Sequence, residues 1–285
     1  MRGYNVASKV GRSVSAVIIA SMSVGTPDGS SLSFLATAKH FENRVAVERL
    51  DLEVAKGELF GLIGPNGAGK TTTIKMAVGL LRPSSGRILV GGFDIQRDGP
   101  RARRLLGYVP DNAPLYDKLT GLEMLELAAD LYQVSRQRRR RRIPALLEAM
   151  DLDSAASQMV QSYSRGMRQK LALCAALVHD PAVLFLDEPT VGLDPMAARQ
   201  LRTMLQTLCA TGHTVFLSTH ALEIAAALCD RVGIFNQGRL VALGTVAELE
   251  RTAGPGSSGS LEEVFMNVTG AEEQETAALI SALGA

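Results

Sequence analysis

Short apolar runs along this chain alternate with longer stretches in which apolar residues recur every three or four positions. The runs at 59–63, 182–186 and 214–218 are mostly apolar, which is typical of strands covered on both faces of a sheet. The stretches at 72–80 and 195–210 have the spacing of amphipathic helices. Strands that alternate with helices in this order predict an α/β fold with a mainly parallel sheet.

Other segments alternate between polar and apolar residues. This pattern at 31–35 and 50–54 predicts half-exposed strands, with a turn at 55–58. We therefore expect an antiparallel β layer beside the main sheet. A hairpin is predicted where the segments 231–235 and 240–243 flank an Asn-Gln-Gly-Arg turn.

The middle of the chain, from 120 to about 158, is predicted to be helical, with Pro144 starting a new helix or kinking the first. Its predicted apolar face consists of Leu122, Leu125, Leu127, Leu131, Leu146, Leu147 and Met150. The arginine-rich run at 136–142 predicts a solvated helix face, and contact with a partner's acidic surface is the alternative. The block at about 111–180 is a candidate inserted helical subdomain.

The clearest chemical signal directly follows the strand at 59–63. The sequence there is Gly64-Pro65-Asn66-Gly67-Ala68-Gly69-Lys70-Thr71-Thr72. A GxxxxGK(S/T) pattern between a strand and a helix predicts a phosphate-binding loop, because side-chain-free glycines let backbone N–H groups curl around an anion. The following helix adds its free N-terminal amides. Lys70 would then reach the β- and γ-phosphates of a bound triphosphate, and Thr71 would ligate Mg²⁺.

A second signal is the acidic pair that ends the apolar run at 182–186. Asp187 is predicted at the carboxyl end of a buried strand, where α/β proteins bind ligands. There it would hold Mg²⁺, directly or through water. Glu188, one residue further on, would orient and polarise an attacking water.

Composition excludes little but sets the background. The chain of 285 residues is 46% hydrophobic, with a formal net charge of +1, so no global field favours nucleic acid or an anionic membrane. No stretch reaches the roughly 20 apolar residues of a membrane-spanning helix. The three cysteines, Cys174, Cys209 and Cys229, lie in apolar helical patterns, which predicts buried, reduced thiols.

The motifs, taken in chain order, resemble the ATP-binding subunit of ABC transporters over about residues 31–245. The resemblance is carried by the phosphate loop and four further motifs: Tyr163-Ser164-Arg165-Gly166-Met167, Leu186-Asp187-Glu188-Pro189-Thr190, Gly192-Leu193-Asp194 and Ser218-Thr219-His220. It implies a P-loop NTPase fold in which two cassettes close head to tail around ATP and Mg²⁺.

The resemblance also implies roles for residues outside the phosphate loop. Ser164, Arg165 and Gly166 would cap the γ-phosphate of ATP bound to the second subunit. His220 would contact the γ-phosphate and hold the closed geometry, and Asp194 would communicate across the dimer. Phe41 is the candidate for stacking on adenine, with ordinary packing as the alternative.

Two positions depart from the family pattern. The signature is usually Leu-Ser-Gly-Gly-Gln, whereas Arg165 here adds positive charge between the serine and the second glycine. The position after Val109-Pro110 is usually Gln and is Asp111 here. Asp111 can still ligate Mg²⁺, but its charge and shorter reach put the tightness of coupling to a transporter in doubt.

The segments 115–121 and 261–270 are similar to the exporter branch that moves drugs, lipids or polysaccharides. We therefore expect an ATPase subunit that forms a homodimer and powers export through a separate membrane permease, at the cytoplasmic face of the membrane. Alternatives are a regulatory or weakly active cassette and an importer subunit. A soluble ABC ATPase that acts on ribosomes or DNA is disfavoured, because the chain holds one cassette and no heptad insert.

These expectations divide the chain into three parts. Residues 1–30 form an extension with a basic start and an apolar run at 14–20, and we expect this extension to be dispensable. Residues 31–250 form the ATPase cassette. Residues 251–285 comprise a Gly-rich linker at 254–259 and a short tail of strand and helix character.

Overall fold

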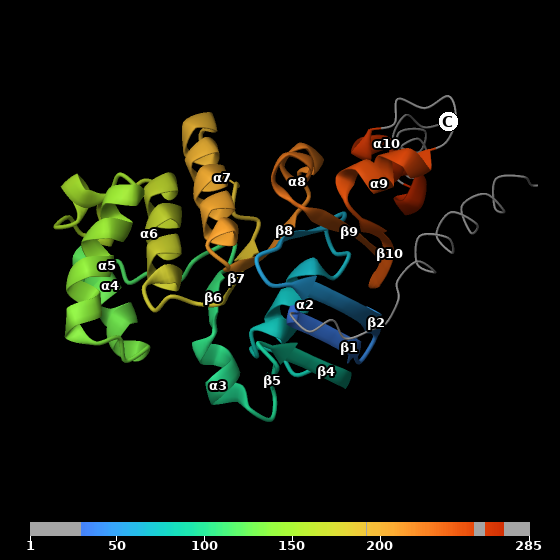
Figure 1. The fold of residues 1–285 in the computed structure, drawn as a ribbon, viewed down its shortest axis with the longest axis horizontal. Helices are drawn as coiled ribbons and strands as arrows, with labels where there is room; N and C mark the ends of the chain where they lie inside the picture. The colour runs from blue at the N-terminus through green and yellow to red at the C-terminus, as the bar shows by residue number, and fades with distance from the viewer. Residues whose placement is uncertain (1–29, 192, 254–259, 271–285) are drawn as a thin grey trace, which may run out of the picture.

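The main sheet of the protein is largely parallel, as predicted. The structure, a computed structural model, describes residues 30–191, 193–253 and 260–270 (Figure 1). The sheet has the order β10-β9-β3-β8-β7-β6, and within it only β10 is antiparallel to its neighbour. Its strands are β3 (Leu59–Ile63), β6 (Leu106–Val109), β7 (Val183–Asp187), β8 (Thr214–Thr219), β9 (Arg231–Asn236) and β10 (Arg239–Gly244).

The predicted antiparallel layer is also present. It has the strand order β2-β1-β4-β5, formed by β1 (Ser30–Phe41), β2 (Arg44–Ala55), β4 (Ser85–Val90) and β5 (Phe93–Asp94). Strands β1 and β2 are longer than the alternating segments predicted at 31–35 and 50–54. The turn between them therefore reaches the loop that joins β3 to α2, which is described below. The chain thus has the P-loop NTPase fold with an added antiparallel layer and a group of helices.

Helices complete the layers. They are α2 (Lys70–Ala77), α3 (Gly99–Arg104), α4 (Gly121–Leu131), α5 (Arg136–Ala149), α6 (Arg165–Leu177), α7 (Pro195–Ala210), α8 (Leu222–Leu228), α9 (Val246–Glu250) and α10 (Leu261–Thr269). Helix α2 contacts strands of both sheets, whereas α4, α5 and α6 gather at one end of the molecule (Figure 1). Within the described residues, no helix is both long and apolar enough to cross a bilayer.

An aromatic cluster joins the two sheets. The ring of Phe216 on β8 lies 5.3 Å from Phe60, 5.6 Å from Phe185 and 6.0 Å from Phe34, measured between centroids. Each of these side chains is fully buried. Because burial of an aromatic side chain contributes a few kcal/mol, this cluster holds the antiparallel layer against the parallel sheet.

The helical region differs from its prediction in the place where the helix breaks and in the burial of two leucines. The alternative that Pro144 starts a new helix is wrong, because this proline lies inside α5. The chain breaks earlier, where Gln133 takes a left-handed φ of 55° and the Ser135 side chain caps the start of α5. Two predicted core leucines, Leu122 and Leu131, are 44% and 74% exposed; Leu122 lies in the first turn of α4, and Leu131 is its last residue, just before the break.

Of the other residues predicted for this apolar face, Leu125, Leu147 and Met150 are buried, and Leu127 and Leu146 are half-buried. All three cysteines are free, with Cys174 and Cys229 buried and Cys209 partly so. Burial raises the pKa of the Cys174 thiol to about 12, so this thiol stays protonated at neutral pH. The predicted linker at 254–259 and residues 1–29 lie outside the described residues, and the part of the tail that is described, α10, is helical.

Candidate functional site

The loop between β3 and α2 is shaped by close backbone contacts. A Cβ on Gly64 would lie 2.1 Å from the carbonyl oxygen of Phe235, and one on Gly69 would lie 2.3 Å from that of Ala46. Gly67 and Gly69 also have left-handed φ angles of 78° and 115°. Gly69 therefore needs both a left-handed φ and the absence of a Cβ, and only glycine provides both. The glycines of the motif are thus required by the path of the backbone.

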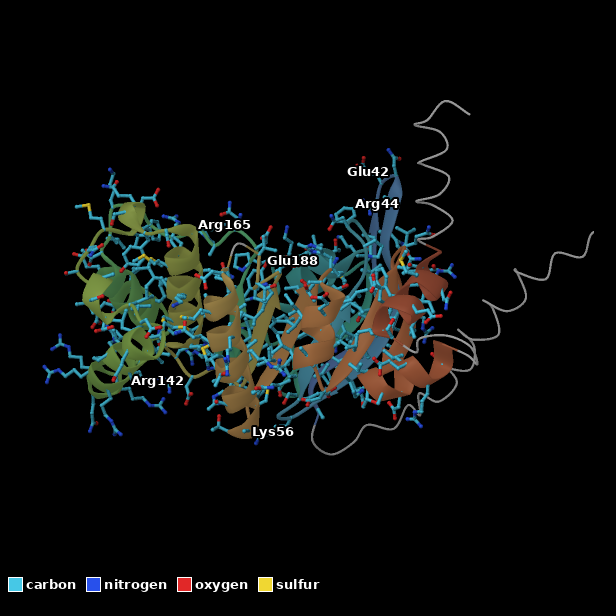
Figure 2. The ribbon with its side chains drawn as sticks, turned by 90° about the horizontal axis from the view of Figure 1, so that it is seen from above. Glu42, Arg44, Lys56, Arg142, Arg165 and Glu188 are labelled. Carbon is cyan, nitrogen blue, oxygen red and sulfur yellow. The ribbon has the colours of Figure 1, made fainter. Side chains whose placement is uncertain are left out.

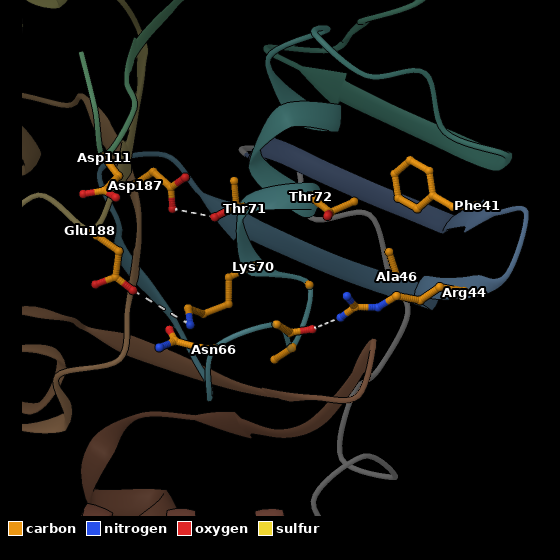
Figure 3. A pocket seen from close by; sticks show the side chains of 13 residues that line it. Phe41, Arg44, Ala46, Asn66, Lys70, Thr71, Thr72, Asp111, Asp187 and Glu188 are labelled. Carbon is orange, nitrogen blue, oxygen red and sulfur yellow. Dashed lines mark hydrogen bonds and ion pairs between the residues drawn. The ribbon is translucent and has the colours of Figure 1, made fainter.

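This loop borders a pocket of about 340 Å³ at the carboxyl end of β7. The β1–β2 hairpin forms its other wall (Figure 3). The pocket is lined by Phe41, Arg44, Ala46, Asn66, Gly67, Ala68, Gly69, Lys70, Thr71, Thr72, Asp111, Asp187 and Glu188. Most residues predicted to bind nucleotide are thus brought together from four separate parts of the chain.

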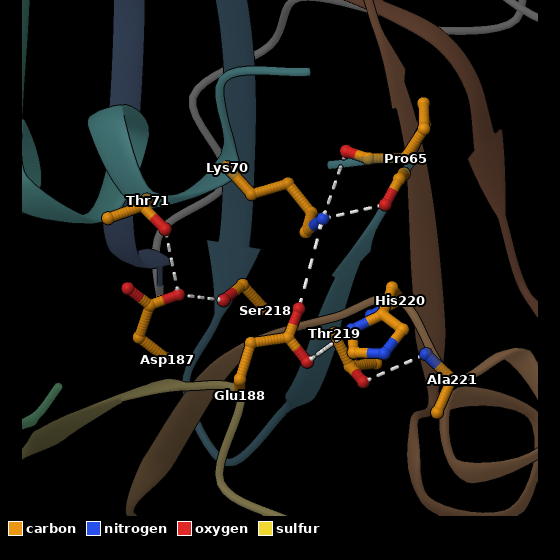
Figure 4. Close-up of polar contacts among 10 residues, drawn as sticks. Pro65, Lys70, Thr71, Asp187, Glu188, Ser218, Thr219, His220 and Ala221 are labelled. Carbon is orange, nitrogen blue, oxygen red and sulfur yellow. Dashed lines mark hydrogen bonds and ion pairs between the residues drawn. The ribbon is translucent and has the colours of Figure 1, made fainter. Parts of the chain in front are cut away.

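Lys70 is the buried cation of this pocket. Its ammonium group donates to the carbonyls of Gly64 at 2.6 Å and Pro65 at 3.2 Å, and lies 3.8 Å from a Glu188 oxygen (Figure 4). Its side chain is only 7% exposed. Burial lowers the pKa of Lys70, while the charges of Glu188 and Asp187 act in the opposite direction. A phosphate group would offer this cation stronger partners than two neutral carbonyls.

Asp187 is held by two hydroxyl groups. The same carboxylate oxygen accepts from Thr71 at 3.2 Å and, over a shorter distance, from Ser218 (Figure 4). Carboxylate and hydroxyl oxygens are ligands that Mg²⁺ prefers, and here both lie at the wall of the pocket beside the glycine-rich loop. The residues therefore fit Mg²⁺. Within the described residues, no group of three or more His, Cys, Asp or Glu side chains is placed to hold a metal alone.

Glu188 has an unusual backbone. Its φ of 50° lies in the left-handed region, which costs a glutamate of order 1 kcal/mol or more. Its amide donates to the Ser218 carbonyl at 3.0 Å, and its carboxylate lies 3.0 Å from Nδ1 of His220. Because the side chain is only 14% exposed and is placed between Lys70 and His220, its direction is well defined.

The signature residues lie outside the pocket. Ser164 is the exposed N-cap of α6, where its hydroxyl accepts from the Met167 amide at 3.3 Å, and Arg165 is also exposed. Gly166 is half-buried in the first turn of α6, and Asp194 caps α7 by accepting from the Ala197 amide at 2.8 Å. Figure 2 shows Arg165 along the same edge of the molecule as Glu188 and Arg44. These groups do not reach the pocket of their own chain.

The hairpin supplies one expected residue and one that the sequence prediction missed. Phe41, the adenine candidate, lines the pocket, is 47% exposed and lies 5.0 Å from the ammonium of Lys39. Arg44 also lines the pocket, and its guanidinium donates to the carbonyl of Gly67 on the phosphate loop (Figure 3). Arg44 was missed because it lies between the two alternating segments, where no motif marked it. Ser218 was quoted only as part of the histidine motif.

Comparisons with known proteins agree with this geometry. A model of the ABC transporter family matches residues 47–191. The chain is 43% identical over 208 residues to an uncharacterized ABC transporter ATP-binding protein of Nostoc sp., covering 72% of this chain and 61% of that protein. It is 42% identical over 216 residues to the daunorubicin resistance ATP-binding protein of Streptomyces coeruleorubidus, covering 76% and 68%.

A solved structure, described as the ATP binding subunit of an ABC transporter, is 34% identical. It superposes with a TM-score of 0.78 and covers 84% of this chain and 99% of that one. The sequence relatives, the solved fold and the pocket all agree with the resemblance seen in the motifs. The chain therefore belongs to the ABC transporter family, as one of its ATP-binding cassettes.

Proposed function

We propose that the chain hydrolyses ATP as a dimer and thereby powers export through a separately encoded membrane permease. The observation that carries this proposal is the convergence of Lys70, Asp187 and Glu188 on one pocket beside the phosphate loop. A cation, a metal-binding carboxylate and a second, precisely directed carboxylate are the groups that phosphoryl transfer to water requires.

Each group has a distinct task in this proposal. Lys70 exchanges its carbonyl partners for the β- and γ-phosphate oxygens and neutralises their charge. Glu188 accepts a hydrogen bond from the attacking water, while His220 fixes the carboxylate from its other side. Thr71 and Asp187 would hold Mg²⁺, with Asp111 at the pocket wall as a further oxygen donor; the ion would neutralise charge on the phosphate oxygens.

Dimerisation is supported by the signature residues, which do not line the pocket of their own chain. The exposed Ser164 hydroxyl and the α6 amides would form an anion-binding helix N-terminus. The next residue, Arg165, lies along the edge that also carries Glu188 (Figure 2). A second copy that approaches this edge head to tail would place its Ser164, with Arg165 and Gly166, opposite the first copy's γ-phosphate. Asp194 would then lie close to the same interface.

The direction of transport rests on resemblance. The Streptomyces relative is named for resistance to daunorubicin, a small molecule. The chain spans 61% of the length of the Nostoc relative, so export, the permease and a location at the cytoplasmic membrane face are part of the proposal. The cargo itself would be selected by the permease.

Replacement of Glu188 tests the enzymatic part. Glu188→Gln should retain ATP binding but slow hydrolysis roughly a hundredfold to ten-thousandfold, because the positioned base is lost. ATP should then trap a stable dimer, which size-exclusion chromatography with light scattering would detect. Glu223→Gln, on α8 outside the pocket, is the matched control. Unchanged turnover in Glu188→Gln would reject the assignment.

A weakly active, regulatory cassette is the second candidate. It is favoured by Asp111, an exposed carboxylate at the pocket wall, in place of the glutamine usual in this family. A carboxylate there adds negative charge next to Asp187, which disfavours a triphosphate unless Mg²⁺ is bound. Asp111→Gln should leave turnover unchanged or raise it if this candidate is right. A sharp loss of turnover would instead show that Asp111 serves the full hydrolytic cycle.

A further inference from the structure

The arginine-rich run on α5 divides into two structural classes. Arg139 and Arg142 face the protein: Arg139 contacts Asp130 at 2.5 Å and Glu126 at 3.4 Å, and Arg142 contacts Asp180 at 3.0 Å. Their guanidinium groups also donate to the carbonyls of Val134 and Leu177. These two arginines attach α5 to its neighbours and thereby set which face of the helix points outward.

The other four arginines of the run are exposed. None of the ion pairs found among the described residues involves Arg136, Arg138, Arg140 or Arg141. Arg104, at the end of α3, is also exposed. Its guanidinium donates to the Gln133 side chain at 3.4 Å, which places a fifth positive charge near the start of α5. We refer to these five arginines as the basic strip.

The basic strip is unusual for an ordinary solvated helix face. Such faces normally mix both signs of charge, because neighbouring like charges repel. Here the nearby acidic groups Glu126, Asp130 and Asp180 are already paired with the two inward arginines. The chain as a whole has a net charge of only +1, so the strip is a local concentration of charge rather than part of a basic protein.

An exposed apolar residue lies beside the strip. Leu131 is 74% exposed at the end of α4, two residues before Gln133. Tyr132, the aromatic residue next to it, is not free to stack on a base, because its ring packs at 3.6 Å against that of His179. Arginines with an exposed leucine and no free aromatic ring suit a bilayer surface better than single-stranded nucleic acid.

We propose that the basic strip binds the surface of a bilayer that contains anionic lipids, with the arginines at the phosphate groups and Leu131 at the headgroup boundary. In Figure 2, Arg142 of α5 lies along the edge of the molecule opposite to Glu188 and Arg165. Lipid bound to the exposed arginines of α5 would therefore leave the edge with the nucleotide pocket free. The inference rests on the proposed function only for the presence of a membrane close by.

Vesicle flotation of the full chain, without permease or nucleotide, tests this inference. The chain should float with vesicles of phosphatidylcholine and phosphatidylglycerol but not with vesicles of phosphatidylcholine alone, and added salt should weaken the binding. Loss of one arginine should weaken binding about fivefold. The combined variant Arg136→Gln, Arg138→Gln, Arg140→Gln, Arg141→Gln should therefore lose roughly several hundredfold at low salt.

A matched control removes four exposed positive charges from other elements. It combines Lys75→Gln, Arg87→Gln, Arg199→Gln and Arg202→Gln, and it should retain most of the binding. Leu131→Ser should weaken binding without a change in charge, whereas Leu80→Ser, at another exposed leucine, should not. Circular dichroism and ATP binding should be unchanged in every variant, which separates this test from that of the proposed function.

Three results would overturn the inference. The first is equal flotation with both kinds of vesicle. The second is an equal loss of binding in the α5 variant and in the control variant, which would show that only net charge matters. The third is strip-dependent binding to RNA or to an acidic polypeptide with no binding to anionic vesicles.

Discussion

The buried hydroxyl of Ser218 should determine how tightly the protein binds magnesium-bound ATP. Ser218 is fully buried on β8 and donates to the Asp187 oxygen that also accepts from Thr71. Asp187 is itself 3% exposed, so little water is available to replace a lost donor. A hydrogen bond to a charged group contributes about 1.5–3 kcal/mol. Only the part of this energy that differs between the free and the bound protein changes affinity. Because Asp187 would lose the donor that fixes its direction, Ser218→Ala should weaken Mg–ATP binding by up to about tenfold, which corresponds to about 1.4 kcal/mol.

Isothermal titration calorimetry with ATP, in the presence of Mg²⁺ and separately with a chelator, measures this effect. The loss should appear mainly with Mg²⁺, because Ser218 acts through Asp187 and not through the phosphate loop. Thr269→Ala is the control, since its buried hydroxyl bonds to the Phe265 carbonyl on α10, away from the pocket. An equal loss with and without Mg²⁺ would show that Ser218 supports the fold of the loop, and the reasoning about Asp187 would be wrong.

Three further outcomes are expected. Lys70→Ala should reduce ATP affinity by at least tenfold, measured by nucleotide fluorescence, because the buried cation is the phosphate partner; unchanged affinity would refute the site. Arg44→Gln should weaken ATP binding several-fold with turnover at saturation nearly unchanged, since it contacts Gly67 and the pocket wall but no catalytic group; a selective loss of turnover would contradict this. Burial lowers the pKa of His179 to about 4 from 6.5, so the unfolded chain binds more protons between these values and stability should fall as pH drops through this range. Urea unfolding at several pH values should show a smaller fall in His179→Asn than in the wild type or in the exposed-site control His40→Asn, and equal falls would refute it.

Several elements of the fold were predictable because their signals are local. The run at β3 was placed correctly from apolar continuity alone, and α7 from its helical spacing. The phosphate loop was predictable for a related reason: it is one continuous segment whose glycines are required by its own backbone path. Asp187 could be placed because a buried strand directly precedes it.

The break between α4 and α5 was not predictable in the same way. Helical periodicity continues across it, and the decisive features are the left-handed Gln133 and the cap at Ser135. Such a short signal competes poorly with a long apolar pattern. As a result, the start of the second helix was wrongly offered at Pro144, and the exposed Leu131 was placed in the core.

The sequence by itself determined the chemistry that lies within single segments: the loop that can cradle a phosphate, its lysine, and the two carboxylates after a buried strand. Only the tertiary structure decided which distant groups join them. Ser218 reaches Asp187 because β7 and β8 pair with these residues in register, and Arg44 reaches Gly67 because the β1–β2 hairpin extends over the loop. The physical reason is that strand pairing and layer packing connect residues far apart in the chain, and no local pattern encodes their partners.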